Sequence, residues 1–387
     1  MRMTRTLLAA LALSLPAFGA AAGPFAGAAQ APQAATQAPA QASRLADIQA
    51  RAEQGDAAAQ LSLGLIYAVG QGVPRDYAQA AAWYRKSAEQ GKALAQLNLG
   101  WCYAAGLGVP QDFAQAAAWY RKAAEQGEPT AQVKLGELYA TGDGVRQDEA
   151  EAAAWYRRAA DQGDAAAQFR LGLALANGRG VNRDEAEAVA LFRRAAERGK
   201  ANAQFMLGVM LEHGRGVAQN LVDAARWYRR AAEQDDATAQ LNLGACYELG
   251  RGVPQDPVQA VAWYRRAADQ GEARAQANLG HAYANGVGVA RDYAQAAAWY
   301  RRAADQGHAP SQYDLGGLYA RALGVQRSDV EACRWFLIAE SRAASAEDAA
   351  AYAAARETLA RRMTATQLAE AQRLAREWTD AFNRRVR

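Results

Sequence analysis

The sequence predicts an all-α fold: a right-handed αα-superhelical solenoid of eight 36-residue helix-turn-helix repeats with terminal capping helices. Three observations support this prediction. A Leu-Gly dipeptide recurs every 36 residues, always with a glutamine four residues before its glycine. A glycine-rich turn follows each dipeptide, and an aromatic Trp-Tyr pair completes most copies. The eight Leu-Gly glycines are Gly64, Gly100, Gly136, Gly172, Gly208, Gly244, Gly280 and Gly316.

The N-terminus predicts export. In residues 1–22, Arg2 and Arg5 precede an apolar run that starts at Leu7, which is typical of a secretory signal peptide. The run is shorter than the ~20 apolar residues of a membrane span, but an uncleaved anchor remains the alternative. Residues 23–43 are rich in Ala, Pro and Gln and predict a flexible linker. Residues 44–56 match the close of a repeat and predict an N-terminal capping helix. We expect a periplasmic or secreted protein.

The charge pattern argues against nucleic acid as a partner. The formal net charge of the 387 residues is +4, and residues of both signs are interspersed, whereas polyanion binding needs a basic patch. We expect a monomer with no stable membrane insertion after signal cleavage. Cys102 and Cys246 lie four repeats apart and Cys333 lies in a later helix, so we predict buried, unpaired thiols.

Each repeat is predicted to contain two helices, A and B. Helix A of the first copy covers about residues 57–69 and contains Gly64. A glycine inside a helix costs ~1 kcal/mol relative to alanine, so we expect the Trp-Tyr pair of helix B to pack closely against it. Helix B follows a residue of the type that caps helix N-termini. The eight predicted caps are Asp76, Asp112, Asp148, Asp184, Asn220, Asp256, Asp292 and Ser328.

The repeats cover residues 57–344 and lose their pattern in the last copy, where the first turn glycine is replaced by Ala322. Two more helices are expected beyond it, at about residues 346–362 and 366–384. Thr364 and Gln367 have the spacing of a capping box at the start of the second. We interpret residues 345–387 as a C-terminal cap that shields the last repeat.

The repeat pattern resembles that of the Sel1-like repeat family, which is related to tetratricopeptide arrays. It reads Ala-x-Ala-Gln-x-x-Leu-Gly-x-x-Tyr-x-x-Gly-x-Gly-Val, then Asp, then Ala-x-x-Trp-Tyr-Arg-Arg/Lys-Ala-Ala. Departures are Leu191-Phe192 for Trp-Tyr, Asp235 for the inter-repeat glycine and the eroded last turn. The resemblance implies an αα-solenoid that serves as a non-enzymatic scaffold or adaptor, and in exported bacterial members a link to signalling, secretion or envelope regulation.

No catalytic, metal or cofactor signature accompanies the repeats. No serine has a lysine three residues on, as a penicillin-recognising enzyme requires. His213, His281 and His308 occupy three different repeat positions without a second ligand at metal-binding spacing. We therefore predict no enzyme activity and no cofactor. Two alternatives stay open: a weak β-lactam-binding or hydrolysing protein, as described for some related proteins, and a cell-wall glycan binder.

Positions that vary between copies are the candidates for recognition, because residues fixed in every copy hold the fold. Three such positions of helix A lie two residues before, one after and five after the Leu-Gly glycine, on one helical face. The resemblance to related arrays places this face on a concave groove. The alternative is that these positions are simply solvated. We predict that the face binds a peptide or protein through Asn98, Trp101, Lys134, Glu137, Arg170, Asn177, Met206, His213, Asn242, Asn278 and His281.

Overall fold

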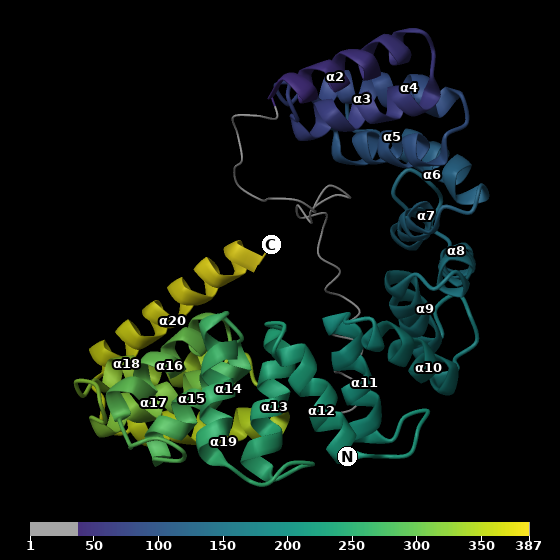
Figure 1. The fold of residues 1–387 in the computed structure, drawn as a ribbon. Helices are drawn as coiled ribbons and strands as arrows, with labels where there is room; N and C mark the ends of the chain where they lie inside the picture. The colour runs from purple at the N-terminus through teal and green to yellow at the C-terminus, as the bar shows by residue number, and fades with distance from the viewer. Residues whose placement is uncertain (1–37, 387) are drawn as a thin grey trace. The chain divides into compact units, whose positions relative to one another are not determined.

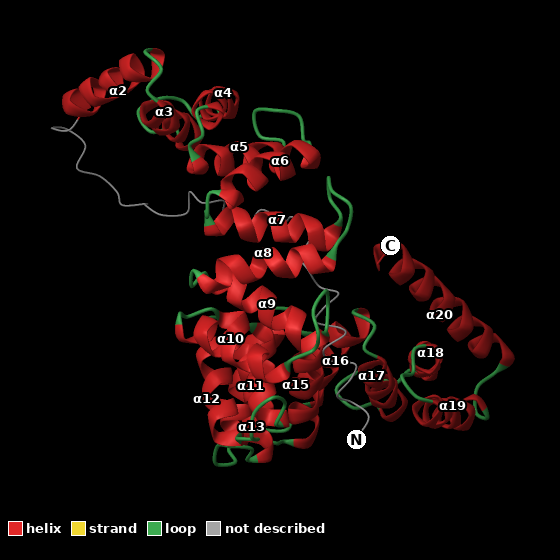
Figure 2. Ribbon diagram, turned by 90° about the vertical axis from the view of Figure 1, so that its right-hand side faces the viewer, coloured by secondary structure: helices red, strands yellow, loops and turns green. Residues whose placement is uncertain are grey.

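The computed structural model describes residues 38–386, and every regular element among them is a helix (Figure 2). The predicted all-α fold of repeated helix pairs is therefore confirmed. The predicted signal peptide, residues 1–22, lies outside the described residues, as do residues 23–37 of the predicted linker. The chain divides into two compact units, which meet in the sequence between Arg198 and Gly199. Each unit is described by itself.

Unit 1 contains a first helix, α2, and four helix pairs (Figure 1). Within each pair the A and B helices pack side by side, and the first three B helices also pack on the A helix of the next pair. The helices are α2 (Ala38–Glu53), α3 (Ala57–Val69), α4 (Tyr77–Glu89), α5 (Ala93–Ala105), α6 (Phe113–Glu125), α7 (Pro129–Thr141), α8 (Glu149–Asp161), α9 (Ala165–Asn177) and α10 (Glu185–Glu197).

Unit 2 contains four more pairs and two terminal helices that both pack on α18. The helices are α11 (Ala201–His213), α12 (Leu221–Ala232), α13 (Ala237–Leu249), α14 (Pro257–Asp269), α15 (Ala273–Asn285), α16 (Tyr293–Asp305), α17 (Ala309–Arg321), α18 (Asp329–Ser341), α19 (Ala346–Ala360) and α20 (Ala365–Val386). The last two lie in the segment that the sequence assigns to a C-terminal cap. Trp378 of α20 packs edge-on against the fully buried Trp335 of α18, with 6.0 Å between ring centroids.

The Leu-Gly glycine lets the two helices of a pair approach closely. A Cβ atom on Gly64 would lie 2.5 Å from Cδ1 of Tyr84, a distance that real Cβ atoms do not show. The predicted partner was the Trp-Tyr pair, but only the tyrosine ring lies against the glycine. Trp83 is half-buried instead, and the Lys86 ammonium lies 3.9 Å from its ring centroid. Two basic residues follow each Trp-Tyr pair, and the second of them lies over the ring of the tryptophan. It thus packs in part as a cation over an aromatic face.

All eight predicted N-caps of the B helices are confirmed. Asp76, for example, accepts hydrogen bonds from the backbone N–H groups of Ala78 and Gln79 at 2.9 and 3.0 Å. The other seven side chains also accept from a backbone N–H in the first turn of their helix. Each cap satisfies donors that would otherwise lack an intrahelical partner.

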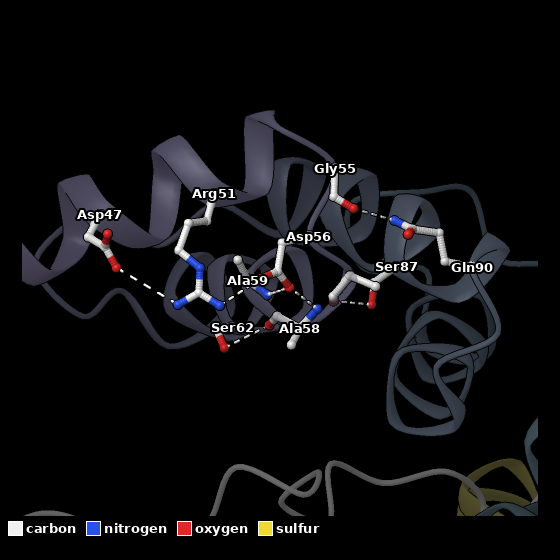
Figure 3. A network of polar contacts seen from close by, with 10 residues as sticks. Asp47, Arg51, Gly55, Asp56, Ala58, Ala59, Ser62, Ser87 and Gln90 are labelled. Atoms are coloured by element: carbon white, nitrogen blue, oxygen red, sulfur yellow. Dashed lines mark hydrogen bonds and ion pairs between the residues drawn. The ribbon is translucent and has the colours of Figure 1, made fainter.

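The N-terminal cap extends further than the sequence suggested. Helix α2 begins at Ala38, so the prediction of a linker up to residue 43 is wrong for its last six residues. Alanine is the strongest helix former, and this segment is rich in it. At the other end of α2, Arg51 pairs with Asp56 at 2.6 Å, while Asp56 caps α3 (Figure 3). The Arg51 hydrogen bond is the main reason why the pKa of Asp56 falls to about 2.

Candidate functional site

Three predicted site residues form a charge cluster in unit 1. Glu137 on α7 accepts a hydrogen bond from Lys134 Nζ of the same helix at 3.0 Å. It also accepts one from Arg170 Nη2 on α9, the A helix of the next repeat, at 2.8 Å. All three side chains are partly buried. Because two cations share one carboxylate, the cluster links successive repeats and keeps an excess positive charge.

The other predicted residues of unit 1 are less available. Asn98 on α5 is only 6% exposed, so its predicted role as a free amide for a partner is wrong for the unbound chain. Trp101 is half-buried, with its ring edge toward Tyr77 and 6.4 Å between ring centroids. The Asn177 amide donates to the Leu173 carbonyl oxygen of its own helix at 2.8 Å. The Asn177 amide therefore serves its own helix, whereas Asn98 is withdrawn from solvent by burial.

In unit 2 the predicted residues divide into buried and accessible ones. Met206 on α11 is 2% exposed, so its predicted place on a binding surface is wrong and it belongs to the core. His213 at the end of α11 and His281 on α15 are exposed. Asn242 on α13 and Asn278 on α15 are half-buried. These four residues remain candidates for recognition.

Each of the two asparagines takes part in a polar triad that the sequence reasoning missed. The Tyr264 hydroxyl on α14 donates to Glu248 Oε2 on α13 at 2.5 Å, and Asn278 lines the same cleft. One repeat earlier, the Tyr228 hydroxyl donates to Glu212 Oε2 at 2.6 Å, and the Asn242 side chain lies close enough to lower the pKa of Tyr228 against the larger effect of burial. The tyrosine that fills the helix interface through its ring therefore brings its hydroxyl to a carboxylate near the surface.

Burial and the neighbouring carboxylate act together on these tyrosines. Desolvation is the first cause that raises the pKa of Tyr264, and the hydrogen bond to Glu248 raises it further. The pKa of Tyr228 is raised by burial and then by Glu212. Both hydroxyls therefore stay protonated and act as donors to the carboxylates.

Glu212 and Glu248 stand out in the sequence by their position in the repeat. They lie four residues after the Leu-Gly glycine, where the other six repeats have alanine: Ala68, Ala104, Ala140, Ala176, Ala284 and Ala320. Because alanine occupies this position in the other repeats, packing of the helices does not require a glutamate there. That departure occurs only in two neighbouring repeats of unit 2.

Unit 1 also has an open cleft of about 770 Å³ at the turn after α7. Arg121, Tyr139, Arg146, Glu151 and Trp155 are among its lining residues. The Arg121 guanidinium donates to the Tyr139 hydroxyl. The cleft thus combines an aromatic floor with charges of both signs, which suits a polypeptide better than a highly charged small ligand.

The described residues offer little for covalent or metal chemistry. Within residues 38–386, no group of three or more His, Cys, Asp or Glu side chains could hold a metal ion. The three cysteines are buried and unpaired, as predicted. Burial raises the pKa of the Cys102 and Cys246 thiols to about 12, so neither is a thiolate at neutral pH. No helix of the described part combines the length and the apolar character that a bilayer span requires.

The stacked helix pairs define the protein as an αα-solenoid. A model of the Sel1 repeat matches eight consecutive segments, residues 57–92, 93–128, 129–164, 165–200, 201–236, 237–272, 273–308 and 309–342. The chain therefore belongs to the Sel1 repeat family. Sel1 repeat proteins are generally protein–protein interaction scaffolds, and this fold is typically non-enzymatic.

Two solved structures are similar over most of the chain. One is a Sel1 repeat protein from Oxalobacter formigenes, with 33% identity, a TM-score of 0.62, and coverage of 85% of this chain and 97% of that one. The other is a protective antigen present in uropathogenic Escherichia coli strains, described as displaying an SLR fold. It shows 31% identity, a TM-score of 0.55, and coverage of 88% of this chain and 96% of that one. No curated protein matches significantly.

Proposed function

We propose that this protein is a non-enzymatic scaffold of the bacterial envelope that binds a protein or peptide through the variable face of its A helices. On each unit, we call the residues at positions −2, +1, +4 and +5 from the Leu-Gly glycine that are not buried the A face. The observation that carries the proposal is the contrast within unit 2. There the residues that are the same in every repeat pack the helices. His281, Asn278 and Glu248 occupy repeat positions that vary, and they place polar groups at the surface.

The kind of partner follows from the chemistry of the A face. Its groups are amides, carboxylates, imidazoles and, in unit 1, the Lys134–Glu137–Arg170 cluster. Such scattered donors and acceptors match a polypeptide backbone with side chains of both signs. A role in signalling, secretion or envelope regulation is consistent with a surface of this kind.

Site-specific photo-crosslinking tests the proposal. A photoreactive amino acid is placed at His213 or His281 on the A face, or at the exposed Gln259 or Gln295 on B helices, and the intact protein is irradiated in envelope extract. We expect a discrete adduct from the two A-face positions and none from the two controls. Adducts of equal yield from all four positions, or from the controls alone, would overturn the assignment of the A face.

We further propose that the protein is exported, because the N-terminal arginines and the apolar run have the pattern of a signal peptide. A fusion of the first 60 residues or so to alkaline phosphatase should be active in the periplasm. Replacing Leu11 and Leu13 by arginine should abolish that activity. Equal activity of both fusions would refute export by this segment.

A further inference from the structure

The triad of repeat 6 contains two side-chain acceptor atoms besides the one that Tyr264 engages. Tyr264 donates its hydroxyl hydrogen to Glu248 Oε2. Asn278 lines the same cleft as this pair, from helix α15. The remaining Oε1 of Glu248 and Oδ1 of Asn278 accept no hydrogen bond from another described residue. A carboxylate and an amide oxygen that line one cleft favour a cationic group with several N–H donors.

These atoms lie in a cleft that suits the tip of one side chain. Glu248, Tyr264, Asn278, His281, Pro257 and Val287 line it. We call this group the repeat 6 socket. Its inner volume of about 10 Å³ is roughly that of one water-sized group. It therefore admits one N–H group of a side-chain tip, with the rest of the tip at the mouth, and not a whole small molecule. Pro257 and the 38%-exposed Val287 give it an apolar rim, against which an aliphatic stem can pack.

Repeat 5 shows which group fills the same place within this chain. The residue equivalent to Val287, 36 positions earlier, is Arg251. Its Nη1 atom lies 3.8 Å from Oε1 of Glu212, the equivalent of Glu248. In repeat 5 an internal guanidinium thus faces the carboxylate oxygen that the tyrosine leaves free. Beside Glu248 the equivalent position is Val287, and no described residue forms an ion pair with this carboxylate.

We propose that the repeat 6 socket binds an arginine side chain supplied by a partner polypeptide, in the place that Arg251 fills in repeat 5. The proposal rests on the proposed scaffold function and adds a specific anchor to it. The guanidinium donates to Glu248 Oε1 and Asn278 Oδ1, and its aliphatic stem packs on Val287. The socket is a single site within unit 2, because each of its groups belongs to helices α13 to α15 or the turn after α15.

The internal precedent provides a matched set of variants. Val287→Arg supplies the cation internally and should close the socket without removing any lining acceptor. Glu248→Gln removes the charge and keeps the shape. Arg251→Val should open a second, equivalent socket in repeat 5. Since Val and Arg already occupy this turn position in neighbouring repeats, neither substitution is foreign to the fold.

The probe is the peptide acetyl-Ala-Ala-Arg-Ala-Ala-amide, titrated into the full-length protein and followed by saturation-transfer difference NMR. The controls are peptides with citrulline, which is neutral and of the same shape, or with lysine. A charge-assisted hydrogen bond contributes ~1.5–3 kcal/mol, so citrulline, Val287→Arg and Glu248→Gln should each weaken binding at least about tenfold. Arg251→Val should raise the number of bound peptides from one to two.

Unchanged binding by Val287→Arg, or equal affinity for the citrulline peptide, would overturn the socket. Equal affinity for the lysine peptide would overturn the assignment to arginine. The failure of the socket is separable from that of the scaffold function. If Val287→Arg still forms the adduct at His281 in envelope extract, the A face binds a partner without this anchor. If the arginine peptide binds but no A-face adduct forms, the socket stands and the scaffold proposal falls.

Discussion

The side-chain amide of Gln126 donates a hydrogen bond to Gln96 Oε1 at 2.7 Å, across the helix pair of repeat 2. Gln96 is the glutamine that precedes the Leu-Gly glycine by four residues, and its own amide donates to the carbonyl oxygen of Ala88 at 3.1 Å. One buried side chain therefore satisfies the end of the preceding B helix and receives a bond from its own B helix. This double role favours glutamine at the position, and Gln168 and Gln312 keep the donated bond even where the second bond is absent.

The hydrogen bond between the two glutamines is absent in two repeats. Arginine replaces the donor glutamine at Arg198 and Arg342, and there the buried Oε1 atoms of Gln168 and Gln312 have no hydrogen-bond partner. Both arginines donate instead to the carbonyl oxygen of an inter-repeat glycine. A buried acceptor without a donor costs ~1–3 kcal/mol, so these two repeats carry a local destabilisation.

Arg198→Gln should restore the missing bond and stabilise the last pair of unit 1 by about 1 kcal/mol. Urea denaturation and hydrogen exchange of α9 amides would measure the change. Arg194→Gln is the control, since Arg194 is an exposed residue of α10, the helix that Arg198 follows, and should have no effect. If the Arg198→Gln variant is no more stable than the parent protein, the missing glutamine–glutamine bond does not destabilise this repeat.

Two adjacent glycines of α17 separate the effect of close packing from that of helix propensity. A Cβ on Gly316 would lie 2.7 Å from the Phe336 ring, whereas one on Gly317 would meet only the Arg321 side chain, at 3.4 Å. Gly316→Ala should therefore lower stability by roughly 1–3 kcal/mol, as for other overpacked sites. Gly317→Ala should raise it by up to ~1 kcal/mol. Thermal denaturation of the two variants gives the comparison, and changes of the same sign would refute the packing argument.

The last repeat lacks the first glycine of its turn, and restoring that glycine should stabilise the protein. Ala322 ends α17 in the left-handed region, with φ of 58°, where the other repeats have glycine. An L-residue pays ~1–2 kcal/mol there, so Ala322→Gly should stabilise unit 2 by about 1 kcal/mol after the entropy of the unfolded glycine is included. Ala320→Gly, inside the same helix, should have the opposite sign. Melting temperatures that fall for both variants would show that the turn is not strained.

The sequence allowed the helix pairs and their caps to be predicted because each signal is local. Asp76 caps the helix that starts beside it. Gly64 indicates a close contact because glycine is otherwise unfavourable inside a helix. The burial of Asn98 and Met206 could not be predicted in this way, since it depends on side chains of other helices. The Glu248–Tyr264 bond was missed for the same reason: the tyrosine ring was assigned to packing, and the reach of its hydroxyl depends on the three-dimensional crossing of the two helices.

Asp314 on α17 provides a pH-dependent test of A-face burial. It occupies the repeat position of Asn242 and Asn278, and burial raises its pKa from 3.8 to about 6, against the opposing effects of His281 and Arg321. Tyr300 on α16 and Tyr352 on α19 are its other titratable neighbours. Because the folded state holds this proton more tightly than the unfolded state, the stabilising contribution is present below about pH 4. It is lost as the pH rises through about 6.

Asp314→Asn should therefore stabilise unit 2 at pH 8 by about 1 kcal/mol, after allowance for partial solvent screening. The gain should shrink toward zero at pH 4, where the wild-type carboxyl is already protonated. Differential scanning calorimetry and hydrogen exchange of α17 at the two pH values measure this difference. Asp380→Asn, at an exposed position of α20, is the control for general charge effects. A gain of equal size at both pH values would mean that the carboxyl shape, and not its buried charge, destabilises the A face.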